Sequence, residues 1–108
     1  MNEGKKLSIV IVTYNSEKDI FDCISSIYKH NDIDEQDLEV IVVDNNSPNG
    51  KAMFRQLNKQ FGNRITLFGN DHNGGYGQGN NVGIRLASSP VVMIMNPDVR
   101  YPKDKHKT

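Results

Sequence analysis

Four short apolar runs recur along the chain, at residues 7–12, 38–43, 65–68 and 91–95. β-Branched residues dominate the first two runs, and residues 91–95 show no alternation of apolar and polar positions. This pattern is typical of strands in parallel sheets, which are covered on both faces. We therefore predict four strands, the last of which is buried on both faces.

Residues with helical spacing fill the three intervals between these runs. Ser16 begins a capping-box-like pattern, and Ser47 followed by Pro48 resembles an N-cap with proline in the first helical turn. Gly62 should end the second helix, and a third helix is expected over residues 82–87. The apolar stripes consist of Ile20, Ile24, Ile27 and Tyr28, then Met53, Leu57 and Phe61, then Val82, Leu86 and Ala87.

Strands and helices therefore alternate along the chain, with connections short enough only for compact crossovers. One hundred and eight residues suit a single domain. If the chain winds outward from the first strand and then reverses, the fourth strand lies beside the first. The crevice between their carboxyl ends is where open α/β sheets bind ligands. We expect an α/β fold with a mostly parallel sheet flanked by helices.

Polar residues follow three of the predicted strands, at residues 13–15, 44–47 and 96–98. Pro97 cannot donate a ladder hydrogen bond and fixes its own φ, so it should end the last strand and hold Asp98 in a stiff turn. Because the carboxyl ends of parallel strands meet at one edge of a sheet, we expect all three clusters to line one cleft.

Two carboxylates in these clusters indicate a division of labour. Asp44 could accept hydrogen bonds from a ribose or a base, and Asp98 could hold a divalent cation that bridges phosphates. Mg²⁺ or Mn²⁺ commonly uses one or two protein carboxylates together with substrate phosphates and water, so a lone Asp98 predicts a metal that arrives with a diphosphate. The alternative is that both acids only cap turns.

Residues 69–81 form a segment rich in glycine and asparagine that fits neither of the well-known phosphate-binding motifs. A dinucleotide fingerprint starting at Gly75 would need glycine where Asn80 stands, and a phosphate loop starting at Gly74 would need lysine there. What remains is a flexible segment whose amide side chains could hydrogen-bond a ligand. The alternative is a wide turn that uses asparagine and glycine for positive φ.

Charge and cysteine content narrow the function classes. The 13 basic and 13 acidic residues cancel, so no net field favours nucleic acid or an anionic membrane surface as a partner. The single cysteine, Cys23, lies in an apolar helical pattern, which favours a packed thiol in a reducing compartment over a nucleophile or a disulfide. No targeting or membrane-spanning segment is visible in the sequence. We expect a cytoplasmic chain, at most peripheral to the inner face of a membrane.

Four blocks of the sequence, taken together, closely resemble the nucleotide-binding half of family 2 glycosyltransferases. They are residues 8–15 (SIVIVTYN), 42–47 (VVDNNS), 73–83 (NGGYGQGNNVG) and 95–98 (MNPD), in that family's order and spacing. The resemblance implies a GT-A (Rossmann-like) fold and inverting transfer of a sugar from a UDP- or dTDP-linked donor to a glycan or lipid-linked acceptor. It also implies Mn²⁺ or Mg²⁺ as cofactor and a role in cell-surface polysaccharide biosynthesis.

Carried over by position, the resemblance implies roles for particular residues. Thr13 and Tyr14 would flank the base, and Asp44 would bind the base and its ribose. Asp98 would be the metal-binding acid of an Asp-x-Asp motif whose first acid is replaced by Asn96. This Asn-Pro-Asp variant favours dTDP-rhamnose or a UDP-sugar as donor. The expected nucleotide-binding set is Thr13, Tyr14, Asn15, Asp44, Asn46, Asn81 and Asn96.

In this family the acceptor-binding half and the carboxylate that deprotonates the acceptor lie well beyond the metal motif. We therefore interpret residues 1–108 as the nucleotide-sugar-binding part of a GT-A domain truncated after that motif, with a core at residues 7–99 and a loose tail at residues 100–108. Neither the acceptor half nor the general base is expected in it. The alternative is a non-catalytic nucleotide-binding or oligomerising module. Self-association is a further expectation, because a cut sheet exposes apolar surface.

Overall fold

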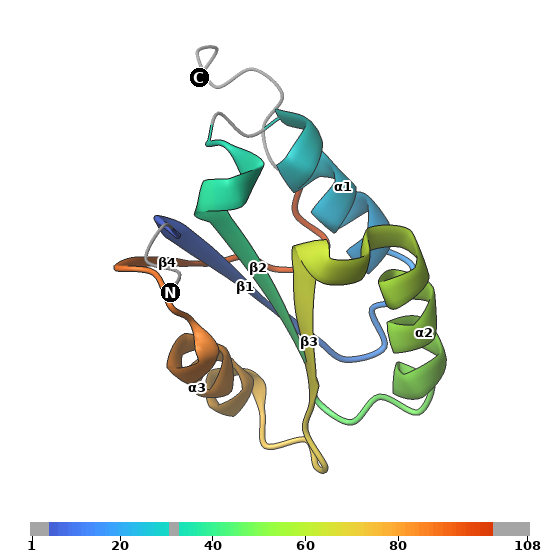
Figure 1. Cartoon of the computed structure of the whole chain (residues 1–108). Coiled ribbons are helices and arrows are strands. Elements are labelled where there is room, and N and C mark those ends of the chain that lie inside the picture. Colours follow the sequence, from blue (N-terminus) through green and yellow to red (C-terminus); the bar gives the residue numbers. More distant parts are fainter. Residues whose placement is uncertain (1–4, 31–32, 101–108) are drawn as a thin grey trace.

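The computed structural model describes residues 5–30 and 33–100, which form a parallel sheet with helices on both faces. The elements follow in the order β1 (Leu7–Thr13), α1 (Ile20–His30), the 3-10 helix η1 (Glu35–Asp37), β2 (Leu38–Asp44), α2 (Gly50–Phe61), η2 (Gly62–Arg64), β3 (Ile65–Gly69), α3 (Tyr76–Leu86) and β4 (Val91–Ile94) (Figure 1). The alternation of strands and helices is as predicted. Within the described ranges, no helix is long and apolar enough to cross a membrane.

The four strands lie in the order β3-β2-β1-β4, and all neighbours are parallel. Leu7 of β1 pairs with Leu38 of β2 on one side and with Val91 of β4 on the other. The chain thus winds outward from β1 to β3 and then returns to the opposite side of β1, which confirms the predicted reversal. A switch point therefore lies at the carboxyl ends of β1 and β4.

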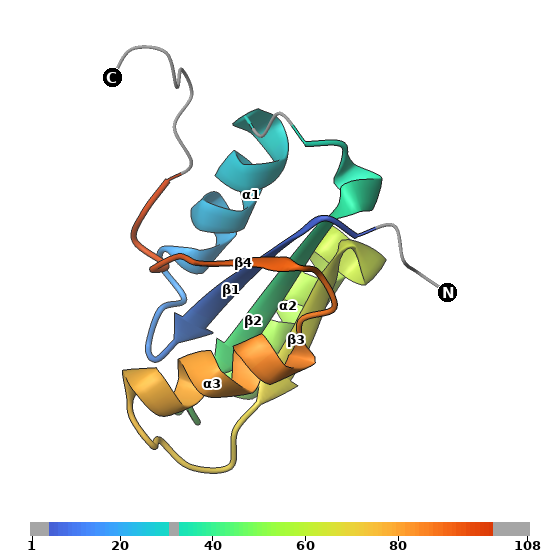
Figure 2. The ribbon, with the colours of Figure 1, turned by 90° about the vertical axis from the view of Figure 1, so that its left-hand side faces the viewer.

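Helices cover the sheet on both faces, with α1 and α2 on one face and α3 on the other (Figures 1 and 2). The side chains of β1 alternate between the two sides. Ile9 and Ile11 belong to the core under α1 and α2, whereas Val10 and Val12 belong to the core under α3. All residues of β1 are buried, which explains its nearly unbroken apolar pattern.

The last strand, β4, lies at the edge of the sheet and differs from the prediction. Val91, Met93 and Ile94 are 55%, 37% and 38% exposed, so the expectation that this strand is buried on both faces is wrong. Within the described residues β4 pairs with β1 alone, and Met95, just beyond its end, joins the core under α1. An apolar run describes the side chains of a strand, but it carries no information on whether neighbouring strands cover it.

The predicted helix ends are partly confirmed. Gly62 ends α2 as expected and has a positive φ angle of 57°. The first helix, however, begins at Ile20 rather than at Ser16. The Ser16 carbonyl accepts from the Ile20 N–H (3.0 Å), but the Ser16 hydroxyl bonds to the backbone of Tyr14 instead of to a helix N–H. The capping-box interpretation of Ser16 is therefore wrong.

The third helix, α3, begins at Tyr76, earlier than the apolar spacing predicts, although glycine disfavours helix formation. Its two buried glycines, Gly79 and Gly83, lie one turn apart against β1. A Cβ on Gly83 would lie 2.2 Å from Cγ1 of Val10. A Cβ on Gly79 would lie 2.8 Å from Cγ1 of Val12. The glycines therefore allow α3 to approach the sheet closely, and this packing outweighs their low helix propensity.

Gly83→Ala should lower the free energy of unfolding by about 1–3 kcal/mol, because the added methyl group overlaps Val10 and pushes α3 from the sheet. Gly77→Ala is the matched control in the same helix. A Cβ on Gly77 meets no atom within 4 Å, so alanine should stabilise the helix there by about 0.5–1 kcal/mol. Urea unfolding followed by circular dichroism measures both changes. Equal stability of the two variants would contradict the close packing of α3.

Candidate functional site

Asp44, the last residue of β2, is buried at the carboxyl edge of the sheet. Its Oδ1 accepts hydrogen bonds from Thr13 Oγ1 (2.7 Å) and Ser47 Oγ (2.6 Å), and its Oδ2 accepts one from the Ser47 N–H (2.8 Å). These bonds hold the carboxylate in one orientation. A carboxylate can accept about four hydrogen bonds, so Oδ2 retains the capacity to accept one from a ligand.

Ser47 joins the loops that follow β1 and β2. Its hydroxyl donates to Asp44 and accepts from the Asn15 N–H (2.9 Å), so it is not the helix N-cap that the sequence indicates. The helix α2 begins at Gly50 instead. Asn15 and Asn46 have positive φ angles of 55° and 64°, a conformation that asparagine adopts more readily than most residues. The two loops therefore have sharply turned backbones, and Ser47 ties them together.

Gly50 brings the start of α2 against the Asp44 carboxylate. A Cβ on Gly50 would lie 2.5 Å from Asp44 Oδ2, so only glycine fits there without movement. The positive end of the α2 dipole therefore lies beside the carboxylate. A hollow of about 890 Å³ opens at this point, and Asn46 is among the residues that line it.

A crevice of about 360 Å³ lies where the ends of β1 and β4 meet the start of α3. Tyr14 and Tyr76 line it and are about half exposed, and Pro97 lines it after β4. The Tyr76 hydroxyl donates to Asn96 Oδ1, which links the start of α3 to the segment that follows β4. The crevice at the switch point is thus lined by two aromatic side chains.

Asp98 lies in a turn beyond β4, and its side chain is exposed. The Arg100 guanidinium holds this turn, because it donates to the Pro97 carbonyl (3.0 Å) and to Oδ1 of Asp19, just before α1 (3.2 Å). Among residues 5–30 and 33–100, no group of three or more His, Cys, Asp or Glu side chains could hold a metal ion. A cation at Asp98 would therefore take further oxygen ligands from a bound molecule or water.

The residues expected to bind a nucleotide are distributed unevenly over this edge. Those from the strand ends gather near the crevice and the hollow: Thr13, Tyr14, Asn15, Asp44, Asn46 and Asn96. Asn81 is exposed on α3 and does not line the crevice, so its expected place near a ligand stays a prediction. Asn45, which is 2% exposed and lines the crevice, is absent from the predicted set. Its position directly after a buried strand is the signal that could have identified it.

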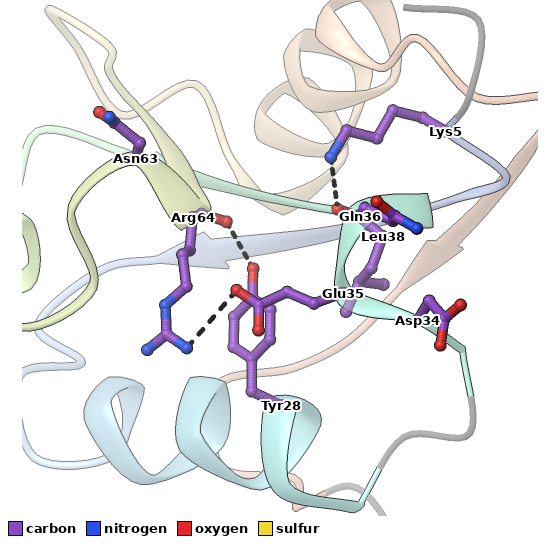
Figure 3. Close-up of a pocket in the computed structure, with 8 residues that line it drawn as sticks. All are labelled: Lys5, Tyr28, Asp34, Glu35, Gln36, Leu38, Asn63 and Arg64. Atoms are coloured by element: carbon purple, nitrogen blue, oxygen red, sulfur yellow. Dashed lines mark hydrogen bonds and ion pairs between the residues drawn. The ribbon is translucent and has the colours of Figure 1, made fainter.

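Another hollow, of about 630 Å³, lies at the opposite end of the sheet, where β1, β2 and β3 begin (Figure 3). Several of the residues that line it bond to one another. Lys5 Nζ donates to the Leu38 carbonyl (3.1 Å). The Tyr28 hydroxyl donates to the Arg64 carbonyl, and the Arg64 guanidinium pairs with Glu35 (3.6 Å). These contacts join α1 and η1 to the starts of the strands, and we assign them a structural role.

Comparison with known families identifies the chain. Residues 8–107 match the family model described as "Glycosyl transferase family 2". The chain belongs to glycosyl transferase family 2. The matched range includes all of β2, β3 and β4, β1 apart from Leu7, and all three polar strand ends. The resemblance drawn from the four sequence blocks is therefore confirmed.

Two relatives of this family 2 chain are named as glycosyltransferases. It is 30% identical over 94 residues to "Poly(ribitol-phosphate) beta-glucosyltransferase" of Bacillus spizizenii, a match that covers 86% of this chain and 15% of the relative. It is 27% identical over 92 residues to "Glycosyltransferase GlyG" of Streptococcus pneumoniae, covering 85% of this chain and 30% of the relative. The chain thus spans less than a third of the length of these relatives.

Two solved structures share the fold. Staphylococcus aureus TarS 1-349, in complex with UDP-GlcNAc, has a TM-score of 0.79 and 30% sequence identity, with 94% of this chain and 29% of the TarS chain covered. The mannosyltransferase PcManGT from Pyrobaculum calidifontis, in complex with GDP-Man and Mn²⁺, also has a TM-score of 0.79, at 25% identity, with 90% and 28% covered. The expected GT-A fold is confirmed.

Cys23 of α1 packs against the segment that follows β4. Its side chain is completely buried, and its Sγ lies 3.8 Å from the Asn96 carbonyl oxygen and 3.9 Å from Met95 Sδ. Burial raises the pKa of the Cys23 thiol to about 11, and the nearby Arg100 charge offsets only part of this effect. The prediction of a packed thiol is confirmed.

This pKa makes stability depend on pH in the alkaline range. An unfolded Cys23 thiol ionises near its ordinary pKa of 9.0, whereas the native thiol keeps its proton to about pH 11, so the native state binds more protons between these values. The free energy of unfolding should be unaffected by this group below that range and should fall as pH rises through it. Urea unfolding on both sides of pH 9.0 measures the loss, which should be smaller in Cys23→Ala. An equal loss in both proteins would contradict the assignment.

Proposed function

We propose that this chain supplies the donor and metal site of a glycosyltransferase that transfers a sugar from a nucleotide diphosphate sugar, with inversion at the anomeric carbon. The observation that carries this proposal is the hydrogen-bonded Asp44 carboxylate at the carboxyl edge of the sheet in a chain of family 2. It lies beside the crevice that Tyr14 and Tyr76 line at the switch point. Support comes from the solved relatives described as complexes with UDP-GlcNAc and GDP-Man.

The nucleoside would bind to the ends of β1 and β2. Asp44 Oδ2 retains the capacity to accept a hydrogen bond from a base N–H or a ribose hydroxyl. Tyr14 lines the crevice and offers an aromatic face to the base, and Thr13 fixes the carboxylate from the neighbouring strand. Asn15 and Asn46 would place amide groups at the same edge. We propose a UDP- or dTDP-linked sugar as donor.

The diphosphate and sugar would lie toward the end of β4. A single exposed carboxylate, Asp98, suits Mn²⁺ or Mg²⁺ that also binds phosphate oxygens, and such an ion would neutralise charge on the leaving nucleoside diphosphate. The amide oxygen of Asn96 accepts a hydrogen bond from Tyr76, and its amide nitrogen would donate to an anionic or hydroxyl oxygen of the sugar donor.

The acceptor is proposed to be a glycan or a lipid-linked molecule of the cell surface. The name of the Bacillus spizizenii relative, with its poly(ribitol-phosphate) acceptor, supports this class. Because the relatives are more than three times longer than the matched part, we place the acceptor-binding part and the general base outside residues 1–108. A cytoplasmic location, at the inner face of the membrane, stays a prediction.

A non-catalytic nucleotide-binding or oligomerising module is the alternative, and one observation favours it. The apolar side chains of β4 are exposed along a strand edge, where a strand of another chain could add to the sheet. Sugar transfer catalysed by residues 1–108 alone would exclude this alternative.

Titration calorimetry of UDP, dTDP and GDP, with and without Mn²⁺, tests the proposed function. We expect Mn²⁺ to strengthen binding, and Asp98→Asn to remove that gain, because the carboxylate ligand is lost. Asp44→Asn should weaken binding about tenfold in either condition, since it removes a charged hydrogen-bond acceptor.

Asp34→Asn is the matched control, because Asp34 is an exposed carboxylate at the opposite end of the sheet. It should leave both affinities unchanged. Failure of the wild-type chain to bind any of the three nucleotides would overturn the proposed function. If Mn²⁺ raised the nucleotide affinity equally in the wild type and in Asp98→Asn, the assignment of Asp98 as a metal ligand would be overturned, and the proposed function would stand.

A further inference from the structure

Asn45 is a buried polar residue between the proposed nucleoside site and α3. It directly follows Asp44, and its backbone N–H donates to the Thr13 carbonyl (2.9 Å), which extends the pairing of β1 and β2 by one step. Only 2% of the residue is exposed. Both ends of its side-chain amide bond to other segments of the chain.

The amide nitrogen of Asn45 holds the start of α3. Nδ2 donates to the Gly75 carbonyl (3.0 Å), and the same carbonyl accepts from the Gly79 N–H (3.1 Å) at the start of the helix. The Gly75 N–H donates to Asn73 Oδ1 (3.0 Å), a bond within the loop that cannot fasten it to the sheet. Asn45 therefore fastens the exposed loop before α3 to the end of β2.

The amide oxygen of Asn45 is held by the loop after β3. It accepts from Asn70 Nδ2 (2.7 Å), which also lies 3.2 Å from Gln78 Oε1. Asn70 is itself fixed, because its backbone N–H donates to the Asp44 carbonyl (2.8 Å). With Asn70 at its oxygen and Gly75 at its nitrogen, the Asn45 amide has one orientation in which both bonds form. A residue lacking either a donor or an acceptor would lose one of them.

We propose that Asn45 is a positioning residue that sets the distance between the Asp44 carboxylate and the facing wall of the crevice, formed by Asn73, Gly75 and Tyr76. It controls the affinity for a nucleoside diphosphate through that wall, without itself having to contact the ligand. This inference rests on the proposed function. Asn70 supports the same wall through the Asn45 amide oxygen and through Gln78 of α3, and it has a smaller effect of the same kind.

Asn45→Ala, Asn70→Ala and the double variant test this arrangement, with UDP as the probe. Calorimetry should show affinity falling about tenfold in Asn45→Ala and about threefold in Asn70→Ala. The double variant should lose less affinity than the product of the two single losses, because one contact of Asn70 is with Asn45 itself. Hydrogen exchange without ligand should show the Gly79 amide exchanging faster in Asn45→Ala, while the amides of β2 keep their protection.

Ser8→Ala is the matched control for a merely structural effect. Ser8 is completely buried at the opposite end of β1, and its hydroxyl donates to Glu39 Oε1 (2.6 Å). Its loss should lower the free energy of unfolding, measured in urea, without changing the affinity for UDP. Asn45→Ala should lower both.

Two results would overturn the inference while the proposed function stands. One is unchanged UDP affinity in Asn45→Ala despite a loss of stability like that of Ser8→Ala. The other is unchanged exchange of the Gly79 amide. Absence of UDP binding in the wild-type chain would overturn the proposed function and the ligand role of Asn45 with it, and the exchange measurement would still decide whether Asn45 fastens α3.

Discussion

The hydrogen bond between Thr13 and Asp44 joins the last residues of the two central strands, and the candidate site depends on it. The parallel register pairs these residues, so their side chains leave the sheet on the same side and meet directly. Ser47 then bonds to the same carboxylate and holds the backbone of Asn15. The register of the sheet therefore sets the geometry of the loops after β1 and β2, and Asn45 extends this control to the loop before α3.

The fold and the gathering of polar residues at one edge of the sheet could be predicted because both depend on local patterns. The strands β1 and β2 have nearly unbroken apolar sequences since both of their faces are covered. Parallel strands end at the same edge, so polar residues that follow separate strands must gather there. The same reasoning failed for β4, because the hydrophobicity of Val91 and Met93 does not show whether other residues cover their side chains.

The remaining features depend on contacts between residues far apart in sequence. Ser47 has the sequence context of an N-cap, but its hydroxyl donates to the Asp44 carboxylate and accepts from the Asn15 N–H, where an N-cap hydroxyl would accept from a helix N–H. Asn45 and Asn70 both have the appearance of ordinary turn residues. Only the order β3-β2-β1-β4, which puts the ends of β2 and β3 side by side, brings Asn70 to Asn45.

The two ends of the proposed donor site are supported unequally. Asp44 is buried and accepts three hydrogen bonds from its surroundings. Asp98 is exposed in a turn beyond the edge strand, and the Arg100–Asp19 pair that braces this turn is partly exposed, where such pairs contribute about 0–1 kcal/mol. Under the proposed function, the nucleoside end is therefore organised before the donor binds, whereas the diphosphate end is ordered largely by the ligand and its cation.

This difference suits sugar transfer, because the nucleoside is unchanged by the reaction and the bond that breaks lies at the other end of the donor. A rigid nucleoside site supplies binding energy in both the ground state and the transition state, and a less rigid diphosphate site can adjust as charge develops on the leaving group.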